Sequence, residues 1–456
     1  MMHVSQAARA LNAPFHGHDV EFSAVGTDSR TLKRGELFVA LRGERFDGHA
    51  FVAEAATAGA AAALVERADD AIALPQIVVA DTTQALGRLG NFWRRRCRVA
   101  LVALTGSSGK TTVKEMLAAI LRAAVGADAV LATRGNLNNH VGVPLTLLEL
   151  RSGHRYAVVE MGMNHAGEIR YITRLAEPDV ALIINAGSAH LEHLGSVEAI
   201  ARAKGEIFEG LNDDGTAVFN ADDRFAPLWR ELAAGKRQLE FGIEIESAVS
   251  ADYELRQLDS MIVLKTPRGE VAATVSAPGL HNVRNALAAG AAASALEVPL
   301  AAIGAGLAHF RGSPGRLQRR RGRNGAAIID DSYNANPDSV HAAIDVLAAL
   351  SGKKILVLGD MGELGSAAAA LHAQIGDYAR AAGLDGLFTI GELAAHAARA
   401  FGAGAHPFAQ IEELVAALTP MLAPQTTLLI KGSRFMRMER VVTALTEATT
   451  EGSHAA

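Results

Sequence analysis

The stretch that decides the fold runs from Val99 to Val113 and reads VALVALTGSSGKTTV. An apolar segment typical of a buried strand, Val99 to Leu104, leads into a glycine-rich turn, and a good helical segment, Val113 to Ala123, follows. Such a turn exposes backbone N–H groups, the helix N-terminus favours anions, and the lysine and threonine of Gly-Lys-Thr supply a cation and a metal-binding hydroxyl. This order of strand, turn and helix predicts a loop that binds nucleotide phosphates.

The spacing of this loop departs from the usual pattern G-x-x-x-x-G-K-[ST], because the first glycine would fall at Leu104. A glycine turn with a chance Lys-Thr is the alternative, and the strand and helix on either side disfavour it. We therefore expect a shortened phosphate loop with Thr111 as a Mg²⁺ ligand. The residues expected to contact the phosphates are Gly106, Ser107, Ser108, Gly109, Lys110, Thr111 and Thr112.

Beyond the loop, apolar strands recur, each followed by a loop and a helix. Continuous apolar runs of this kind are typical of a parallel sheet with both faces covered. The further strands expected are Tyr156 to Met161, Val180 to Asn185 and Thr216 to Asn220. We predict that residues 97–312 form a central nucleotide-binding domain.

A hinge is expected at Arg311 to Arg316, where two glycines, a proline and a serine interrupt the pattern. The α/β alternation then restarts, which predicts a second doubly wound, Rossmann-like domain over residues 313–456 with a polar end. Its expected strands are Ala326 to Asp330, Ile355 to Leu358, Leu387 to Ile390 and Thr427 to Ile430.

Residues 1–96 are expected to form a smaller α/β domain. Its signals are strands at Leu37 to Leu41 and Ile77 to Ala80 and a helical segment from Phe51. The small-residue run Ala55 to Val65 is too short to cross a bilayer and is expected to be a buried helix. The fold class is therefore α/β with three domains.

Composition excludes several classes of protein. A chain of 456 residues, 49% hydrophobic and 20% charged, suggests two to four globular domains. The net charge of -5 gives no broad positive field for nucleic acid, and Arg94 to Arg98 is interpreted as a solvated helix end. A single cysteine, Cys97, excludes an intramolecular disulfide and a Cys-rich zinc site and favours a reducing compartment. Because Met1 to Phe15 has no signal-peptide pattern, we expect a soluble cytoplasmic protein without membrane insertion.

Two side chains after neighbouring strands are candidates for the metal site that a phosphate loop needs. Glu160 ends one strand and His190 follows another, so both should lie at the same sheet edge as the loop. Glu160 could equally cap a helix or lie in a solvated loop, and Mg²⁺ rarely chooses imidazole. Lys204 has the pattern of an ordinary exposed helix lysine and gains no role from spacing.

Several strings together resemble the Mur ligase family of ATP-dependent, amide-bond-forming enzymes of peptidoglycan synthesis, over essentially the whole chain. The loop Thr105 to Thr112 resembles the family's Thr-Gly-x-x-Gly-Lys-Thr, which also lacks the distant glycine. The strings similar to the UDP-binding first domain are Thr27 to Arg30, Gly35 to Gly43 and Asp47 to His49.

Further strings resemble the family member that adds a dipeptide. They are Glu160 to Asn164 with Gly167 to Ile169, Asp331 to Pro337, Leu358 to Gly365 with His372, and Lys431 to Arg434. The Asp-Asn-Pro-Arg motif of the diaminopimelate-adding relative is absent from the sequence. The resemblance implies ATP, two Mg²⁺ ions, UDP-N-acetylmuramoyl-tripeptide and D-alanyl-D-alanine as ligands, and an acyl-phosphate intermediate.

The resemblance also implies site residues. The expected catalytic group is Lys110, Glu160, His190, Lys204 and Arg316. The expected metal ligands are Thr111, Glu160, His190 and Lys204, the last in the form carbamylated by CO₂. Nucleotide contacts are expected from Asn285, in an adenine-contacting loop His281 to Asn285, from Arg316 and from Asp331; substrate contacts are expected from Ser29, Arg30 and Asn164.

Local alternatives stay open for these residues. Asn285 could cap a helix, Arg316 could be a solvated linker residue, and Asp331 could cap the following turn. For the whole chain, the alternatives are another ligase of the family, a P-loop NTPase switch, or a silent UDP-sugar-peptide-binding scaffold. We expect a monomer that does not bind nucleic acid.

Overall fold

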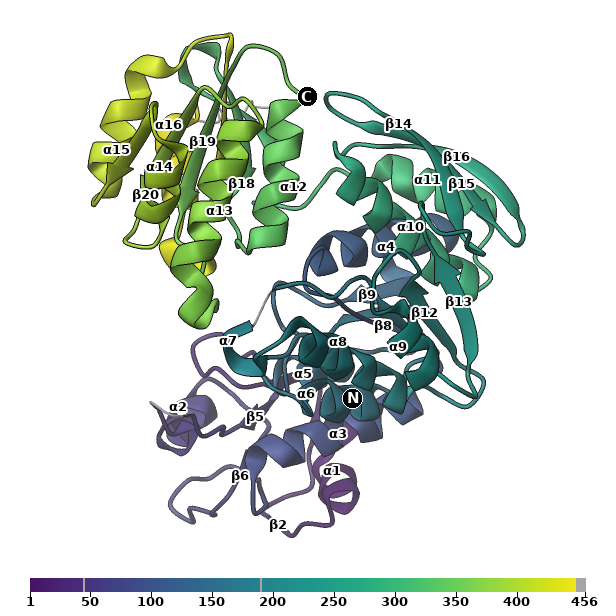
Figure 1. Cartoon of the computed structure of the whole chain (residues 1–456). Helices are drawn as coiled ribbons and strands as arrows, with labels where there is room; N and C mark the ends of the chain where they lie inside the picture. Colours follow the sequence, from purple (N-terminus) through teal and green to yellow (C-terminus); the bar gives the residue numbers. More distant parts are fainter. Residues whose placement is uncertain (44–45, 189–190, 448–456) are drawn as a thin grey trace, which may run out of the picture.

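The computed structural model describes residues 1–43, 46–188 and 191–447. The chain forms three α/β units in sequence order (Figure 1). In this view the first unit, in purple, lies below the central teal unit, and the yellow-green C-terminal unit lies at the upper left. The predicted three-part α/β architecture is confirmed.

The central unit is built on a parallel sheet with the strand order β13-β12-β11-β8-β10-β9. Its strands are β8 (Ala100–Thr105), β9 (Val130–Ala132), β10 (Tyr156–Glu160), β11 (Val180–Ile183), β12 (Thr216–Asn220) and β13 (Arg237–Phe241). β8 lies between β10 and β11, so the loop that follows it emerges between the ends of two neighbouring strands. This placement is the topological switch point at which doubly wound sheets bind ligands.

Helices cover both faces of this sheet, as the apolar strands predict. They are α4 (Lys110–Val125), α5 (Gly142–Leu148), α6 (Glu168–Ala176), α8 (Val197–Gly205), α9 (Ala226–Leu232), α10 (Leu280–Ala295) and α11 (Leu300–His309). The short helix α7 (Leu191–Leu194) has no buried residue and contacts α8 instead. Val102 and Leu104 pack toward α4, α10 and α11, whereas Leu101 and Ala103 face the core with α5, α6 and α8. Among the described residues, no helix is long and apolar enough to cross a bilayer.

An antiparallel sheet in the central unit was not expected from the sequence. It consists of β14 (Ser250–Leu255), β15 (Ser260–Thr266) and β16 (Gly269–Val275). β15 packs closely on α10, where a Cβ at Gly290 would lie 2.6 Å from the Leu264 side chain. One face of these strands stays exposed: in β15 the buried Ile262 and Leu264 alternate with the exposed Met261 and the half-buried Val263, although the run itself is apolar.

The first unit combines β1 (Met2–His3) and β3 (Glu21–Phe22) with a sheet of order β2-β7-β6-β5-β4. The members of that sheet are β2 (Phe15–His16), β4 (Val25–Gly26), β5 (Leu37–Val39), β6 (Ala62–Val65) and β7 (Gln76–Val78). Its helices are α1 (Val4–Leu11), α2 (Val52–Thr57) and α3 (Thr82–Arg96).

The prediction of one buried helix from Ala55 to Val65 is wrong. The helix α2 ends at Thr57, Gly59 takes φ +92°, and the chain returns as the fully buried strand β6 between β5 and β7. Periodicity alone does not separate a short buried strand from a buried helix, and the glycine was the signal that divides this run.

The interpretation of Arg94 as part of a solvated helix end is also wrong. Its side chain is 7% exposed, and Nε donates to the Ala176 carbonyl at 2.9 Å. Its Nη2 also lies 3.3 Å from Asp179. Helix α3 therefore joins the first unit to the central one through Arg94, because Ala176 ends α6 and Asp179 lies in the turn before β11.

The C-terminal unit has a sheet of order β17-β18-β22-β19-β20-β21, parallel except for β17. Its strands are β17 (Gln318–Arg321), β18 (Ala327–Asp331), β19 (Lys353–Gly359), β20 (Gly386–Ile390), β21 (Ala405–Phe408) and β22 (Thr426–Lys431). Its helices are α12 (Pro337–Ala348), α13 (Ala368–Ala381), α14 (Ala394–Phe401), α15 (Ile411–Leu418) and α16 (Glu439–Leu445). Each of the strands expected in this domain is present within two residues of its predicted ends.

Candidate active site

The glycine-rich turn joins the end of β8 at Thr105 to the start of α4 at Lys110. The backbone N–H groups of Ser107 and Ser108 both donate to Asn185 Oδ1 at 3.0 Å. Lys110 Nζ folds back to the Gly106 carbonyl at 2.7 Å. The turn thus has the strand-to-helix geometry of a phosphate loop, with its lysine held at the mouth of the turn.

Glu160 lies beside this loop because β10 pairs with β8 in a register that sets Glu160 opposite Leu104. Its carboxylate accepts from Thr111 Oγ1 at 3.0 Å and from Asn138 Nδ2 at 2.9 Å. Its backbone N–H donates to Thr133 Oγ1, and the residue is 3% exposed. A buried carboxylate held at the threonine of a phosphate loop is suited to a cation rather than to a helix cap.

The donors present fit Mg²⁺. The Thr111 hydroxyl and the Glu160 carboxylate are oxygen ligands of the class that Mg²⁺ prefers, and the ion usually takes its other ligands from phosphates and water. Within residues 1–43, 46–188 and 191–447, no group of three or more His, Cys, Asp or Glu side chains is placed to bind a metal ion. His190, the other ligand suggested by the sequence, lies outside the described residues.

Lys204 is buried, so its interpretation as an ordinary exposed helix lysine is wrong. It is 1% exposed on α8, and burial, followed by the nearby positive charge of Lys110, lowers its pKa well below the usual value. Among the described residues it has no ion-pair or hydrogen-bond partner. A lysine in this setting favours a neutral amine, the form that reacts with CO₂.

Arg316 reaches the phosphate loop from the C-terminal unit. Its Nη2 donates to Thr111 Oγ1 at 3.0 Å, and its guanidinium carbon lies 4.3 Å from the centre of the Tyr333 ring. Burial lowers the pKa of the Lys110 ammonium. The negative charge of Glu160 opposes that shift, and the positive charge of Arg316 adds to it. Arg316 is therefore not a solvated linker residue.

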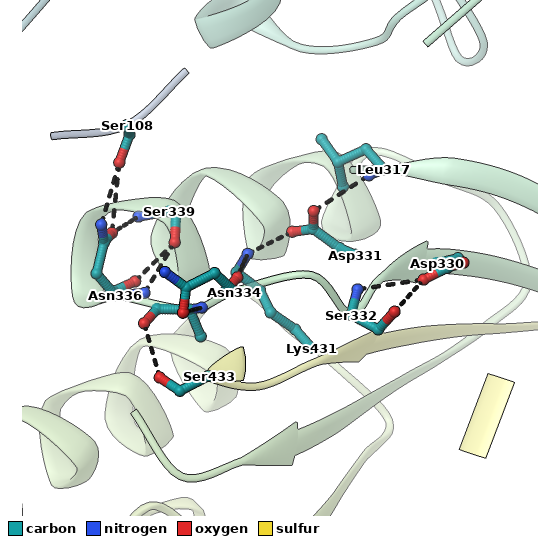
Figure 2. A network of polar contacts seen from close by, with 11 residues as sticks. Ser108, Leu317, Asp330, Asp331, Ser332, Asn334, Asn336, Ser339, Lys431 and Ser433 are labelled. Atoms are coloured by element: carbon teal, nitrogen blue, oxygen red, sulfur yellow. Dashed lines mark hydrogen bonds and ion pairs between the residues drawn. The ribbon is translucent and has the colours of Figure 1, made fainter. Parts of the chain in front are cut away.

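Asp331 pairs with Lys431 at the ends of the neighbouring strands β18 and β22 (Figure 2). Lys431 Nζ donates to Asp331 Oδ2 at 2.6 Å and to the Asn334 carbonyl at 3.0 Å. Asp331 Oδ1 accepts from the Leu317 N–H instead of capping the turn that follows it. Burial raises the pKa of Asp331, and Lys431 opposes that shift.

The segment His281 to Asn285 begins helix α10 and is not a loop. Asn285 Nδ2 donates to Asn282 Oδ1 at 3.2 Å, and the N-cap of the helix is Gly279, so Asn285 does not cap it. Asn285 also lies against the phosphate loop, since a Cβ on Gly109 would be 2.4 Å from Asn285 Oδ1. Burial lowers the pKa of His281 to about 4, with Lys431 adding to the shift, so this imidazole is neutral at pH 7.

A cavity of about 1130 Å³ between the central and C-terminal units brings most of the expected residues together. Its walls include Lys110, Glu160, Asn164, Asn285, Arg316 and Asp331. Ser29 and Arg30 lie outside it, in the first unit, where Ser29 Oγ donates to Glu54 and Arg30 pairs with Asp28. That pairing lowers the pKa of Asp28 to about 2.

Three residues of this site received no role from the sequence. Asn138 holds the Glu160 carboxylate, Tyr333 lies under Arg316, and Lys431 neutralises Asp331. For Asn138, the available signal was the polar run from Thr133 to Asn139 directly after β9. Tyr333 and Lys431 belong to strings already noted, but only the sheet order shows what they contact.

Arg316→Ala is expected to lower the turnover of nucleotide about a hundredfold while changing the unfolding temperature little. The reason is that Arg316 supplies positive charge at the phosphate loop from another unit and belongs to none of the hydrophobic core clusters of the described residues. Steady-state kinetics and thermal unfolding measure the two effects, with the exposed Arg321→Ala as the matched control. Parallel losses of activity and stability would instead favour a structural role.

Models of one protein family match each of the three units. "Mur ligase family, catalytic domain" matches residues 21–94, "Mur ligase middle domain" matches 104–293, and "Mur ligase, glutamate ligase domain" matches 315–434. Each match falls within one expected domain, 1–96, 97–312 or 313–456. The domain boundaries themselves stay a prediction.

Similar proteins span almost the whole chain. UDP-N-acetylmuramoyl-tripeptide--D-alanyl-D-alanine ligase of Escherichia coli (strain K12) is 44% identical, over 97% of this chain and 98% of the relative. The ligase of the same name from Bacillus subtilis (strain 168) is 36% identical, over 93% of both chains. A crystal structure of MurF from Acinetobacter baumannii has a TM-score of 0.91 at 40% identity, over 96% of this chain and 97% of the other. The MurF ligase of Thermotoga maritima in complex with ADP has a TM-score of 0.81 at 29% identity, over 92% and 96%.

Proposed function

The chain belongs to the Mur ligase family, and on that premise we propose that it joins D-alanyl-D-alanine to UDP-N-acetylmuramoyl-tripeptide at the expense of ATP. The observation that carries this proposal is the 44% identity to the Escherichia coli ligase over 97% of the chain. The reaction belongs to peptidoglycan precursor synthesis, and we propose that it takes place in the cytoplasm with a monomeric enzyme.

The chemistry requires activation of a carboxylate, which is a poor electrophile because its leaving group would be oxide or hydroxide. In the first step, the terminal carboxylate of the tripeptide attacks the γ-phosphorus of ATP, giving an acyl phosphate and ADP. The amine of D-alanyl-D-alanine then attacks the acyl carbon and loses a proton. The tetrahedral intermediate collapses to the amide and inorganic phosphate.

Two anions meet in the first step, so charge must be neutralised where they approach. Lys110 of the phosphate loop supplies part of this positive charge, and Arg316, which reaches the loop from the C-terminal unit, supplies the rest. Thr111 and Glu160 would hold Mg²⁺, which when bound neutralises phosphate charge. We propose Glu160, His190 and a carbamylated Lys204 as ligands of a second Mg²⁺.

Residues that line the cavity are candidates for contacts with the nucleotide and the substrate. Asn285 and Asp331 are proposed to contact ATP, and Asn164 to contact the peptide part of the substrate. Ser29 and Arg30 are proposed to contact its UDP end.

The segment Arg311 to Gly315 is proposed as the hinge that lets the C-terminal unit close. Gly312 takes φ +78° and Gly315 φ +68°, backbone conformations that favour glycine. Closure would hold Arg316 at the phosphate loop, where it bonds Thr111 in this structure, and exclude water from the acyl phosphate, which would otherwise hydrolyse.

The proposal predicts that phosphate release requires both the UDP-muramoyl-tripeptide and D-alanyl-D-alanine. The experiment compares D-alanyl-D-alanine, D-alanine, diaminopimelate and no amine in the presence of ATP and Mg²⁺. Mass spectrometry should detect a product heavier by one dipeptide less one water. Release with a different amine would keep the family but change the member, whereas nucleotide binding without amine-dependent turnover would favour a switch or a scaffold.

A further inference from the structure

The first turn of α12, in the C-terminal unit, contacts the phosphate loop of the central unit. Asn336 is the N-cap of this helix, and its Oδ1 accepts from the Ser339 N–H at 2.9 Å. The Asn336 Nδ2 donates to Ser108 Oγ at 3.2 Å, across the boundary between the units (Figure 2). Asn336 therefore caps α12 and also bonds the start of this helix to the loop expected to bind phosphates.

Two residues further on, Asp338 makes a second contact between the same units. Its Oδ2 accepts from the Ser188 backbone N–H at 2.9 Å and from Ser188 Oγ at 3.0 Å. The neighbouring Gly187 permits this approach, because a Cβ there would lie 2.2 Å from Asp338 Oδ2. A carboxylate from one unit therefore holds the backbone of a loop in the other.

The loop that Asp338 holds, residues 185–188, is itself bonded to the phosphate loop. The Gly187 N–H donates to Ser107 Oγ at 2.8 Å, and Asn185 accepts from two backbone N–H groups of the phosphate loop. The Ala186 N–H donates to Asp223 Oδ2 on the far side. A displacement at Ser188 would therefore be transmitted directly to Ser107 and Ser108.

We propose that Asp338 is a positioning residue: by binding Ser188, it aligns loop 185–188, and through this loop the phosphate loop, when the C-terminal unit is closed. The position of the unit is thus coupled to the geometry of the nucleotide site. A carboxylate near bound phosphates would be repulsive in itself, so its contribution comes from the two hydrogen bonds that it accepts. The role in turnover rests on the proposed ligase function, whereas the contact with Ser188 does not.

Hydrogen–deuterium exchange tests the contact without any ligase activity. In Asp338→Ala, backbone exchange in peptides covering residues 185–188 should accelerate, because the Ser188 N–H loses its acceptor. Asp338→Asn should retain most of the protection, since its amide oxygen still accepts. The control is Asp377→Ala, which breaks an exposed ion pair with Arg380 inside the C-terminal unit. Unchanged exchange at 185–188 in Asp338→Ala would overturn the proposal.

Steady-state kinetics test the proposed effect of Asp338 on turnover. At saturating substrates, Asp338→Ala should lower kcat about fivefold with a smaller effect on the KM of the amine, because exposed hydrogen bonds of this kind contribute modestly. Asp338→Asn should recover most of kcat. Adding Ser188→Ala to Asp338→Ala should lower kcat little further, since the hydrogen bond of the Ser188 hydroxyl to Asp338 is already lost in the single variant.

An Asp338→Ala enzyme as fast as the parent, or an Asp338→Asn enzyme as slow as Asp338→Ala, would overturn the positioning role. Failure of the unsubstituted chain to release phosphate with D-alanyl-D-alanine would refute the proposed function instead, and the exchange result would be unaffected.

Discussion

Replacing Lys110 by alanine is expected to lower ATP turnover at least about a thousandfold while leaving the protein folded. The ammonium is the cation of the phosphate loop, and it donates a hydrogen bond to the Gly106 carbonyl of the same loop. Removal therefore takes positive charge from the place where two anions must meet. Release of ADP in the presence of both substrates measures the effect.

The control for this variant is Lys265→Ala, which removes a partly exposed lysine of the central unit that pairs with Asp252 away from the cavity. It should retain nearly full activity. Circular dichroism and thermal unfolding should show both variants folded. A folded Lys110→Ala enzyme with near-normal turnover would refute the assignment of this loop to ATP phosphates.

The sequence predicted the parts of the site that lie directly at the ends of strands. The order of strand, glycine turn and helix located the phosphate loop, and the end of the next apolar run located Glu160 at the same edge. Both predictions depend on local pattern together with one rule of parallel sheets, that strand ends meet at one edge. These residues could be placed without knowing how distant segments of the chain pack together.

Residues whose role depends on packing between distant segments could not be placed in this way. The buried state of Lys204 follows from the way α8 packs on the sheet, and a lysine in a helical pattern gives no sign of it. Likewise, Lys431 meets Asp331 because β22 inserts between β18 and β19, an order that the sequence does not state. The contact of Asp338 with Ser188 joins residues 150 positions apart in the chain.

Replacing Lys204 by alanine is expected to lower turnover about a hundredfold, and added short-chain carboxylic acids should restore part of it. Burial lowers the pKa of this lysine, so its amine is available in the neutral form. A neutral amine adds to the carbon of CO₂ and releases one proton, which gives an anionic carbamate with two oxygen donors. This product would place an anion near the Lys110 ammonium, a change that favours both that cation and a metal ion.

Lys114 provides a matched control for this last prediction. It is another buried lysine of the central unit, at 2% exposure, but its ammonium is already bonded to the Thr133 carbonyl and to Glu115. Lys114→Ala removes the same side chain from a comparable environment, and carboxylic acids should not restore its activity. Nuclear magnetic resonance with isotopically labelled CO₂ should detect a carbamate in the parent and lose it in Lys204→Ala. Equal rescue of both variants, or no labelled carbamate in the parent, would contradict carbamylation.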